Sequence, residues 1–295
     1  MAVMAGSSKD RMSDAYAAIP AELASPWNER GKFAFDEDLL LRLIKVQDDG
    51  GDSKANTGAL ALAVDIWIAT ELRRAAIASD IIWPRPTRPR VLSQSLSSAT
   101  ARFKYARKKT TREVEEATIS KLGELAGSSS TKVLGGFFAK EIDVVIAEYD
   151  RGLELGVSTK TMTKSFGKNI TNRFEEASGD LLNIRRRFPL ATFGYVFLVT
   201  SNVLMEPNCW ERIKDMCHKL ESLTPGDQRG SYDATCLLLL ERGPKGPRLL
   251  QEEVPDELQP DVFLSKMVFE LFSRSPVSEH VAARELWEAS RAPDP

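Results

Sequence analysis

The first third of the chain carries hydrophobic residues at steps of three and four positions, a spacing typical of helices. Residues 36–46 show this stripe, and residues 57–79 continue it over a longer, mostly apolar stretch. Three prolines within residues 84–89 then interrupt regular structure, because proline has no N–H donor and does not fit inside a helix. Two more helices are predicted at residues 93–105 and 111–125. The pattern therefore predicts that the chain opens with a helical region.

The pattern changes after residue 133, where stretches typical of strands alternate with helical stretches. Residues 140–150 alternate apolar and polar side chains, as a half-buried strand does. Residues 190–200 are almost continuously apolar, as expected for a strand that is covered on both faces of its sheet. Strands are predicted at residues 140–150, 152–161, 190–200 and 234–241, and helices at residues 169–187, 209–223 and 260–272. This order predicts an α/β fold with a mixed β-sheet flanked by helices.

These patterns divide the chain into three predicted parts. A helical N-terminal region occupies residues 1–110, an α/β core occupies residues 111–275, and a C-terminal helical tail occupies residues 276–295. We expect the core to carry the chemistry of the protein, and the N-terminal region to supply contacts to a partner or to a second copy.

Composition narrows the class of protein. The hydrophobic fraction is 42% and the net charge is −2, which is typical of a globular protein and gives no global attraction to nucleic acid. The apolar stretch at residues 58–70 is too short for a bilayer and contains Asp65, and the N-terminus shows no secretory signal. We therefore expect a cytoplasmic protein with no membrane partner.

Histidine and cysteine are scarce. The chain has 2 histidines and 3 cysteines, which argues against a histidine-based zinc site, a Ser-His-Asp triad and a disulfide framework. Any chemistry would then depend on carboxylates and lysines.

Basic residues are concentrated in residues 81–112, which hold no acidic residue. Such a segment can neutralise phosphates and release counterions. A solvated linker and helix face is an equally good interpretation of the charge alone. The candidate phosphate contacts are Arg107, Lys108 and Lys109.

One pair of residues points to phosphodiester chemistry. Asp143 lies in the predicted strand at residues 140–150, and Lys160 follows 17 residues later near the end of the next strand. If the two strands are antiparallel neighbours, both side chains can meet across a short turn. A carboxylate can hold a divalent ion against a phosphate, while a lysine positions water or stabilises developing charge.

At these residues the sequence resembles the restriction-endonuclease-like superfamily, whose motif is Pro-Asp … (Asp/Glu)-x-Lys. The resemblance covers about residues 111–241 and implies a PD-(D/E)xK nuclease core. It assigns metal binding to Asp143, catalysis to Lys160 and a further metal contact to the carbonyl of Thr159. Two positions depart from the motif: Ile142 replaces proline, and Ser158 stands where most members carry a carboxylate.

A minority of these enzymes with Ser-x-Lys take the missing carboxylate from the following helix. Here Glu175 and Glu176 lie on that helix, so both are candidate catalytic and metal-binding residues together with Ser158. Adjacent helical residues point about 100° apart, so one of them should face the site, and we prefer Glu176. Glu116 and Glu124 are further candidates with weaker support.

The resemblance implies a Mg²⁺-dependent DNA endonuclease, with Mn²⁺ as a substitute metal, of the type II restriction enzymes of bacterial defence. Its partner would be double-stranded DNA, and palindromic cutting would call for a homodimer. Lys164, Lys168 and Arg173 would hold DNA phosphates or simply form surface charge. The alternative is a nuclease-like fold that has lost catalysis and acts as a DNA-binding or assembly module, which Ser158 keeps open.

Overall fold

The computed structural model describes residues 8–49, 57–86, 90–91, 131–206, 208–221 and 230–291. Several sequence predictions lie outside these residues. They are the helices at residues 93–105 and 111–125, the boundary between residues 110 and 111, and the side chains of Arg107, Lys108, Lys109, Glu116 and Glu124.

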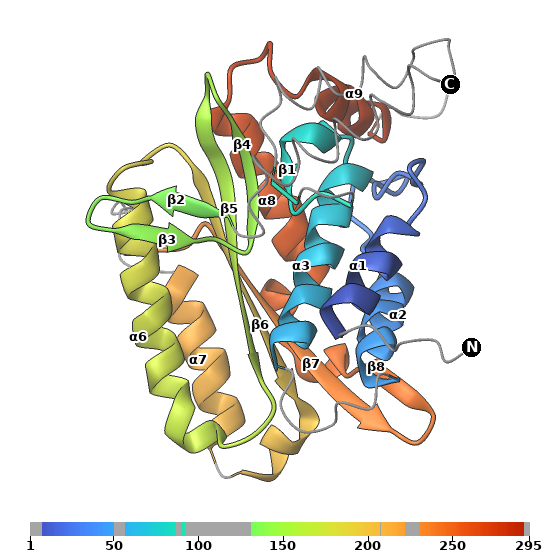
Figure 1. Cartoon of the computed structure of the whole chain (residues 1–295), viewed down its shortest axis with the longest axis vertical. Coiled ribbons are helices and arrows are strands. Elements are labelled where there is room, and N and C mark those ends of the chain that lie inside the picture. Colours follow the sequence, from blue (N-terminus) through green and yellow to red (C-terminus); the bar gives the residue numbers. More distant parts are fainter. Residues whose placement is uncertain are drawn as a thin grey trace, which may run out of the picture.

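A six-stranded mixed sheet forms the centre of the molecule, with strand order β1-β4-β5-β6-β7-β8 (Figure 1). β5, β6 and β7 are parallel neighbours, β4 and β8 pair antiparallel with β5 and β7, and β1 pairs antiparallel with β4. All residues of β6 are buried, as its continuous apolar sequence predicted. The strands are β1 (Ile82–Trp83), β4 (Val144–Glu148), β5 (Gly152–Met162), β6 (Thr192–Thr200), β7 (Ala234–Gly243) and β8 (Gly246–Leu249).

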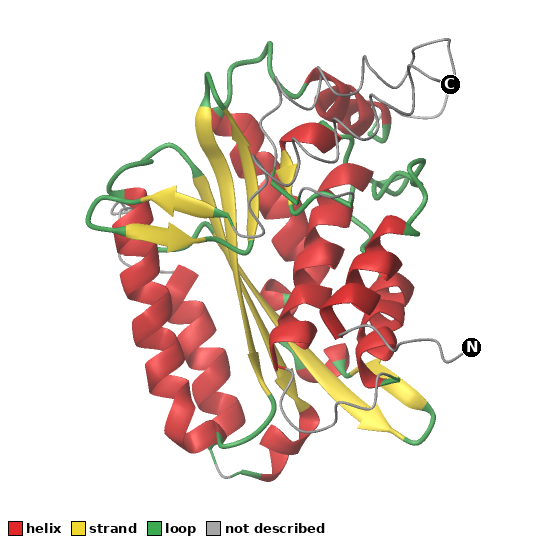
Figure 2. Cartoon of the chain, in the orientation of Figure 1, coloured by secondary structure: helices red, strands yellow, loops and turns green. Residues whose placement is uncertain are grey.

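Helices cover both faces of this sheet (Figure 2). The helices are α1 (Ser8–Ala17), α2 (Glu37–Asp48), α3 (Thr57–Arg74), α6 (Phe166–Arg185), α7 (Cys209–Glu221), α8 (Pro260–Arg274) and α9 (Val281–Ala289). α6 and α7 pack on one face, while α1, α2, α3 and α8 share a hydrophobic cluster with the other face. The N-terminal helices therefore contribute to the hydrophobic core on one face of the sheet. The result is an α/β fold with a curled mixed sheet between helices.

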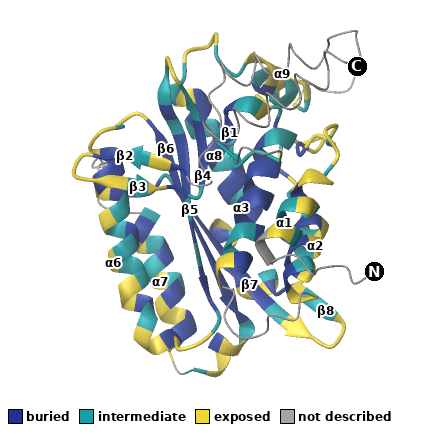
Figure 3. Ribbon diagram, viewed as in Figure 1, coloured by how far each residue is buried: buried dark blue, intermediate teal, exposed yellow. Residues whose placement is uncertain are grey.

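Strand alternation separates the two clusters, because successive side chains point to opposite faces. Leu155 and Val157 of β5 belong to the cluster under α3, whereas Met162 belongs to the cluster under α6. The buried strands and exposed outer helix faces are visible in Figure 3. Beyond the register shift opposite Ile146 and Ala147, the parity of a β5 residue therefore decides which layer its side chain faces.

The predicted strand at residues 140–150 is two strands, and this corrects the sequence prediction. β3 (Ala139–Glu141) pairs with β2 (Lys132–Leu134) in a separate antiparallel hairpin, and β4 begins after Asp143. The β2 and β3 residues are exposed or half-buried, so their sequence carries no apolar signal of a strand. Asp143 therefore lies immediately before β4 and not inside a strand.

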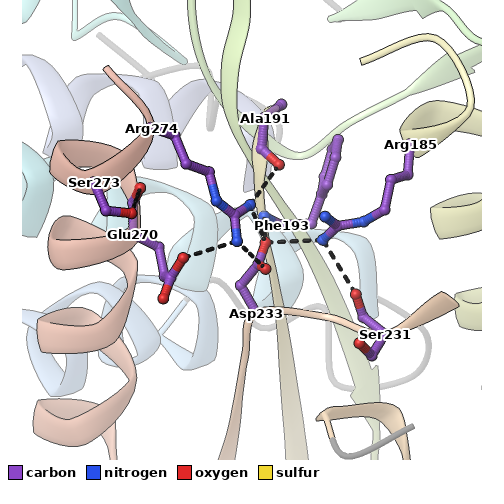
Figure 4. A network of polar contacts seen from close by, with 8 residues as sticks. All are labelled: Arg185, Ala191, Phe193, Ser231, Asp233, Glu270, Ser273 and Arg274. Carbon is purple, nitrogen blue, oxygen red and sulfur yellow. Dashed lines mark hydrogen bonds and ion pairs between the residues drawn. The ribbon is translucent and has the colours of Figure 1, made fainter. Parts of the chain in front are cut away.

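A buried ion-pair network joins the two helical layers at the start of β7 (Figure 4). Asp233 accepts from Arg185 of α6 at 2.8 Å and from Arg274 of α8 at 2.6 Å. The same carboxylate accepts the N–H of Phe193 at 2.7 Å. All three charged groups are buried or nearly so, and an unpaired buried charge is strongly destabilising. The network therefore stabilises the fold as long as each charge keeps its partner.

None of the helices in the described part of the chain has the length and apolar character needed to cross a bilayer.

Candidate functional site

Asp143 and Lys160 lie on neighbouring antiparallel segments, which is the condition under which their spacing allows the side chains to meet. The β4–β5 ladder ends where Val144 faces Val157. One residue beyond that end, Asp143 Oδ2 accepts the backbone N–H of Thr159 at 2.8 Å. The side chain of Asp143 therefore spans the gap from β4 to the Ser158-Thr159-Lys160 segment of β5.

Thr159 also contacts a second acid on α3. Its hydroxyl donates to Asp65 Oδ1 at 2.5 Å, and Asp65 is 9% exposed. This contact follows from strand parity, because Thr159 faces the α3 side of the sheet with Leu155 and Val157. One threonine thus holds the half-buried carboxyl group of Asp143 through its amide and the buried carboxyl group of Asp65 through its hydroxyl.

The charge of Asp143 disfavours the ionised form of Asp65. Burial raises the pKa of Asp65 well above its ordinary value, and the charge of Asp143 raises it further. Burial also raises the pKa of Asp143, against the opposing effects of the Thr159 N–H and the Lys160 ammonium. Two like charges in a poorly solvated place favour binding of a proton or a cation.

Glu71 on the same helix provides a contrast. This buried carboxylate accepts the N–H of Asp36 at 2.8 Å and pairs with Arg74 at 2.6 Å. Burial raises its pKa to about 7, yet its partners are a backbone amide and a cation. Glu71 therefore has the surroundings of a structural group, whereas Asp65 faces a second acid.

Lys160 points to the opposite face of β5, toward α6. Its Nζ lies 3.2 Å from Glu176 Oε1, and Arg173 Nη1 lies 2.8 Å from Glu176 Oε2. Burial acts to raise the pKa of Glu176, but Lys160 and Arg173 outweigh burial and lower it. Glu175 is exposed. Of the two candidate glutamates, the structure thus brings Glu176 to Lys160.

Ser158 faces the same side as Lys160 and lines a small cavity under α6. Asp180 and Tyr232 line this cavity too, and Asp180 pairs with Lys140 at 2.7 Å. Tyr232 donates its hydroxyl to the carbonyl of Ala177 at 3.0 Å. Burial raises the pKa of Tyr232, and the charges of Asp180 and Asp143 add to the effect. Asp180 is therefore the carboxylate of α6 that lies beside the Ser158 cavity.

The donors around Thr159 suit a hard divalent cation. The N–H and C=O of one strand residue point to the same side, so the Thr159 carbonyl lies on the Asp143 side of β5, past the end of the ladder. Two carboxylates and a carbonyl are oxygen donors of the kind that Mg²⁺ takes from proteins. In the described part of the chain, no group of three or more His, Cys, Asp or Glu side chains gathers as a metal cage. A two-carboxylate site would complete its shell with water and phosphate oxygens.

The remaining predicted residues surround this arrangement. Lys164 and Lys168 are exposed where β5 passes into α6, and Arg173 is held by Glu176. Sequence reasoning missed Asp65 and Asp180 as site residues. A usable signal existed for Asp65, because it is the charged residue inside the apolar stretch at residues 58–70.

Comparisons of the chain with protein-family models, with curated proteins and with solved structures each found no match.

Proposed function

We propose that this protein is a Mg²⁺-dependent endonuclease that hydrolyses phosphodiester bonds of double-stranded DNA. The observation that carries the proposal is the contact of Thr159 with both Asp65 and Asp143, with Lys160 as the next residue of the strand. Metal-binding carboxylates and a nearby lysine form the grouping that phosphodiester hydrolysis needs. Here the charge of Lys160 acts to lower the pKa of both carboxyl groups, although its side chain lies on the α6 face of β5. A restriction-endonuclease-like core is part of the proposal, and it is supported by the order of β4, β5, α6 and β6.

In this proposal Asp65 and Asp143 bind the metal through their carboxylate oxygens, with the Thr159 carbonyl as a further donor. The bound Mg²⁺ would act as a Lewis acid on the phosphate and lower the pKa of a bound water. Lys160 orients the attacking water or stabilises charge that develops on the phosphate oxygens. Its ion pair with Glu176 fixes the direction of the ammonium group.

This assignment gives Asp65 the role that the family resemblance assigns to Glu175 or Glu176. The reason is geometric: Asp65 and Asp143 share Thr159, whereas Glu176 is engaged by Lys160 and Arg173. Glu176 then acts as a positioning residue. Cutting of palindromic sites in bacterial defence would further require two copies of the site, hence a symmetric dimer.

The direct test is cleavage of supercoiled plasmid DNA with Mg²⁺, with Mn²⁺ and with a chelator. Cleavage should need the metal, and both Lys160→Ala and Asp143→Asn should abolish it. DNA affinity of the Lys160→Ala protein should stay within several-fold, because one lysine is a small share of the phosphate contacts. Cleavage by either variant at the wild-type rate would remove the assignment.

Ser158 favours a second candidate function, a DNA-binding or assembly module without catalysis. A neutral hydroxyl is a poor replacement for a charged metal ligand. This candidate predicts metal-independent DNA binding and no nicking of diverse plasmids under any metal, which the same assay would record.

A further inference from the structure

The β2–β3 hairpin presents an apolar tip that the fold leaves uncovered. Phe137 is 62% exposed, Phe138 is 53% exposed and Leu134 is 54% exposed, and Gly135 and Gly136 complete the tip. The hairpin projects from the molecule (Figure 1). Exposed aromatic residues at its end contribute no burial energy to the fold. A compact, exposed apolar patch of this kind marks a contact surface.

The tip is held rigidly, so its exposure is a fixed feature of the fold. The Asn183 side-chain oxygen of α6 accepts the N–H groups of Phe137 at 2.9 Å and Phe138 at 3.2 Å. The Asn183 amide donates to the Phe138 carbonyl at 3.0 Å, and the Gly136 N–H donates to the Asn183 carbonyl at 2.7 Å. A partner would thus meet aromatic rings that are already ordered, which reduces the entropy lost on binding.

A positively charged side chain lies beside the tip. The Arg186 guanidinium lies 5.1 Å from the centroid of the Phe137 ring. Arg187 follows just past the end of α6, with its guanidinium 5.9 Å from the centroid of the Phe188 ring. Within the described residues, neither arginine has a carboxylate at ion-pair distance, and both are exposed. Unpaired arginines next to exposed aromatic rings complement a polymer that combines phosphates with stacked bases.

The hairpin is also continuous with the candidate site. β3 ends at Glu141, two residues before Asp143, and Lys140 and Glu141 line the cavity beside Ser158. DNA whose phosphate lies at the Asp143 and Lys160 side chains would therefore run close to the hairpin.

We propose that Phe137 and Phe138 form an apolar wedge that contacts the bases of duplex DNA and opens a base step, while Arg186 and Arg187 hold the flanking phosphates. The wedge rests on the proposed function for its substrate, double-stranded DNA. Its contribution is to distort the duplex beside the scissile phosphate, since apolar side chains placed between base pairs unstack them and kink the DNA.

The test uses the full-length protein and a pool of short random-sequence duplexes that contain 2-aminopurine, with a chelator present so that binding is separated from cleavage. Wild-type protein should increase the 2-aminopurine fluorescence. Phe137→Ala and Phe138→Ala should each weaken binding about tenfold and reduce the fluorescence change, without altering the salt dependence of binding. Arg186→Ala should lower the salt slope by about one unit.

Tyr149→Ala is the matched control, because Tyr149 is 93% exposed at the β4–β5 turn, away from the hairpin tip. This variant should bind like the wild type. Equal affinity and fluorescence in the phenylalanine variants would overturn the wedge, even if the protein cleaves DNA. Loss of a dimer in sedimentation by these variants, with unchanged DNA affinity, would overturn it in favour of contact with a second copy. Base unstacking without metal-dependent cleavage would support the wedge and contradict the proposed nuclease activity.

Discussion

Asp65 and Asp143 are 78 positions apart in the sequence, yet both carboxyl groups bind the same residue, Thr159. Asp65 comes from a helix on one face of the sheet, and Asp143 comes from the loop before β4. Burial raises the pKa of both carboxyl groups, and the charge of Asp143 adds to the effect at Asp65. Two adjacent carboxylates destabilise the folded protein when no cation is bound, and a bound cation removes this destabilisation. Experiments can therefore distinguish the effect of the pair on stability from its effect on activity.

Replacement of Asp65 by asparagine should raise stability and abolish cleavage. The asparagine side chain would keep an acceptor for the Thr159 hydroxyl and remove one of two adjacent negative charges. We expect the free energy of unfolding at pH 8 to increase by about 1 kcal/mol, measured by urea denaturation, while metal-dependent plasmid cleavage is lost. The matched control is Glu71→Gln on the same helix, which should leave cleavage intact. A destabilised but active Asp65→Asn protein would contradict the assignment.

The same pair should make stability depend on pH. Both pKa values are raised in the folded state, so the folded protein binds more protons than the unfolded chain at pH values between the unfolded and folded pKa values. The contribution of the pair to stability is therefore present at low pH and is lost as pH rises through the folded pKa values. The difference in Tm between wild type and Asp65→Asn should grow from weakly acidic pH to pH 8.

Added Mg²⁺ should reduce that difference in Tm at pH 8, because the cation replaces the protons and binds the folded state. Glu71→Gln should retain the Mg²⁺ response. If Mg²⁺ raises the Tm of wild type and Asp65→Asn equally, the metal binds elsewhere.

Glu175 and Glu176 should differ sharply in their effects. Glu176 pairs with Lys160 at 3.2 Å, whereas Glu175 is exposed. Alanine at Glu176 should reduce the cleavage rate at least about tenfold by releasing the Lys160 ammonium, and alanine at Glu175 should leave the rate unchanged. Glu176→Gln should recover part of the activity, because an amide still accepts a hydrogen bond from Lys160. Wild-type rates in both alanine variants would show that neither glutamate supports the lysine.

The Asp233 network should be a main determinant of stability. Asp233→Ala leaves Arg185 and Arg274 without their shared carboxylate, so we expect a loss of about 3 kcal/mol in the free energy of unfolding. Asp215→Ala is the control, because Asp215 forms an exposed pair with Lys219 and should change stability by less than about 1 kcal/mol. Urea denaturation of both variants measures the difference in stability. Equal midpoints would show that the Asp233 network contributes no more than an exposed ion pair.

The sequence by itself determined the main elements of the α/β core. Continuous apolar runs predicted β6 and β7, because a strand covered on both faces has no polar positions. Helical stripes predicted α2, α6, α7 and α8 to within a few residues, since burial of one face imposes the spacing. The spacing of Asp143 and Lys160 is compatible with antiparallel neighbouring strands joined by a short turn, and β4 and β5 pair in this way.

Tertiary structure alone decided which carboxylates meet. Asp65 and Asp143 share Thr159 because α3 packs on the face of β5 to which the Thr159 side chain points. No local sequence pattern indicates which helix covers which face. Glu176 pairs with Lys160 because the Lys160 side chain points to the other face of β5 from Thr159, where α6 packs. The β2–β3 hairpin escaped prediction because Asn183 of α6 holds its turn, whereas its own residues are too exposed to show a strand pattern. Local periodicity reports how deeply an element is buried, and partners distant in the sequence are fixed only when the layers pack together.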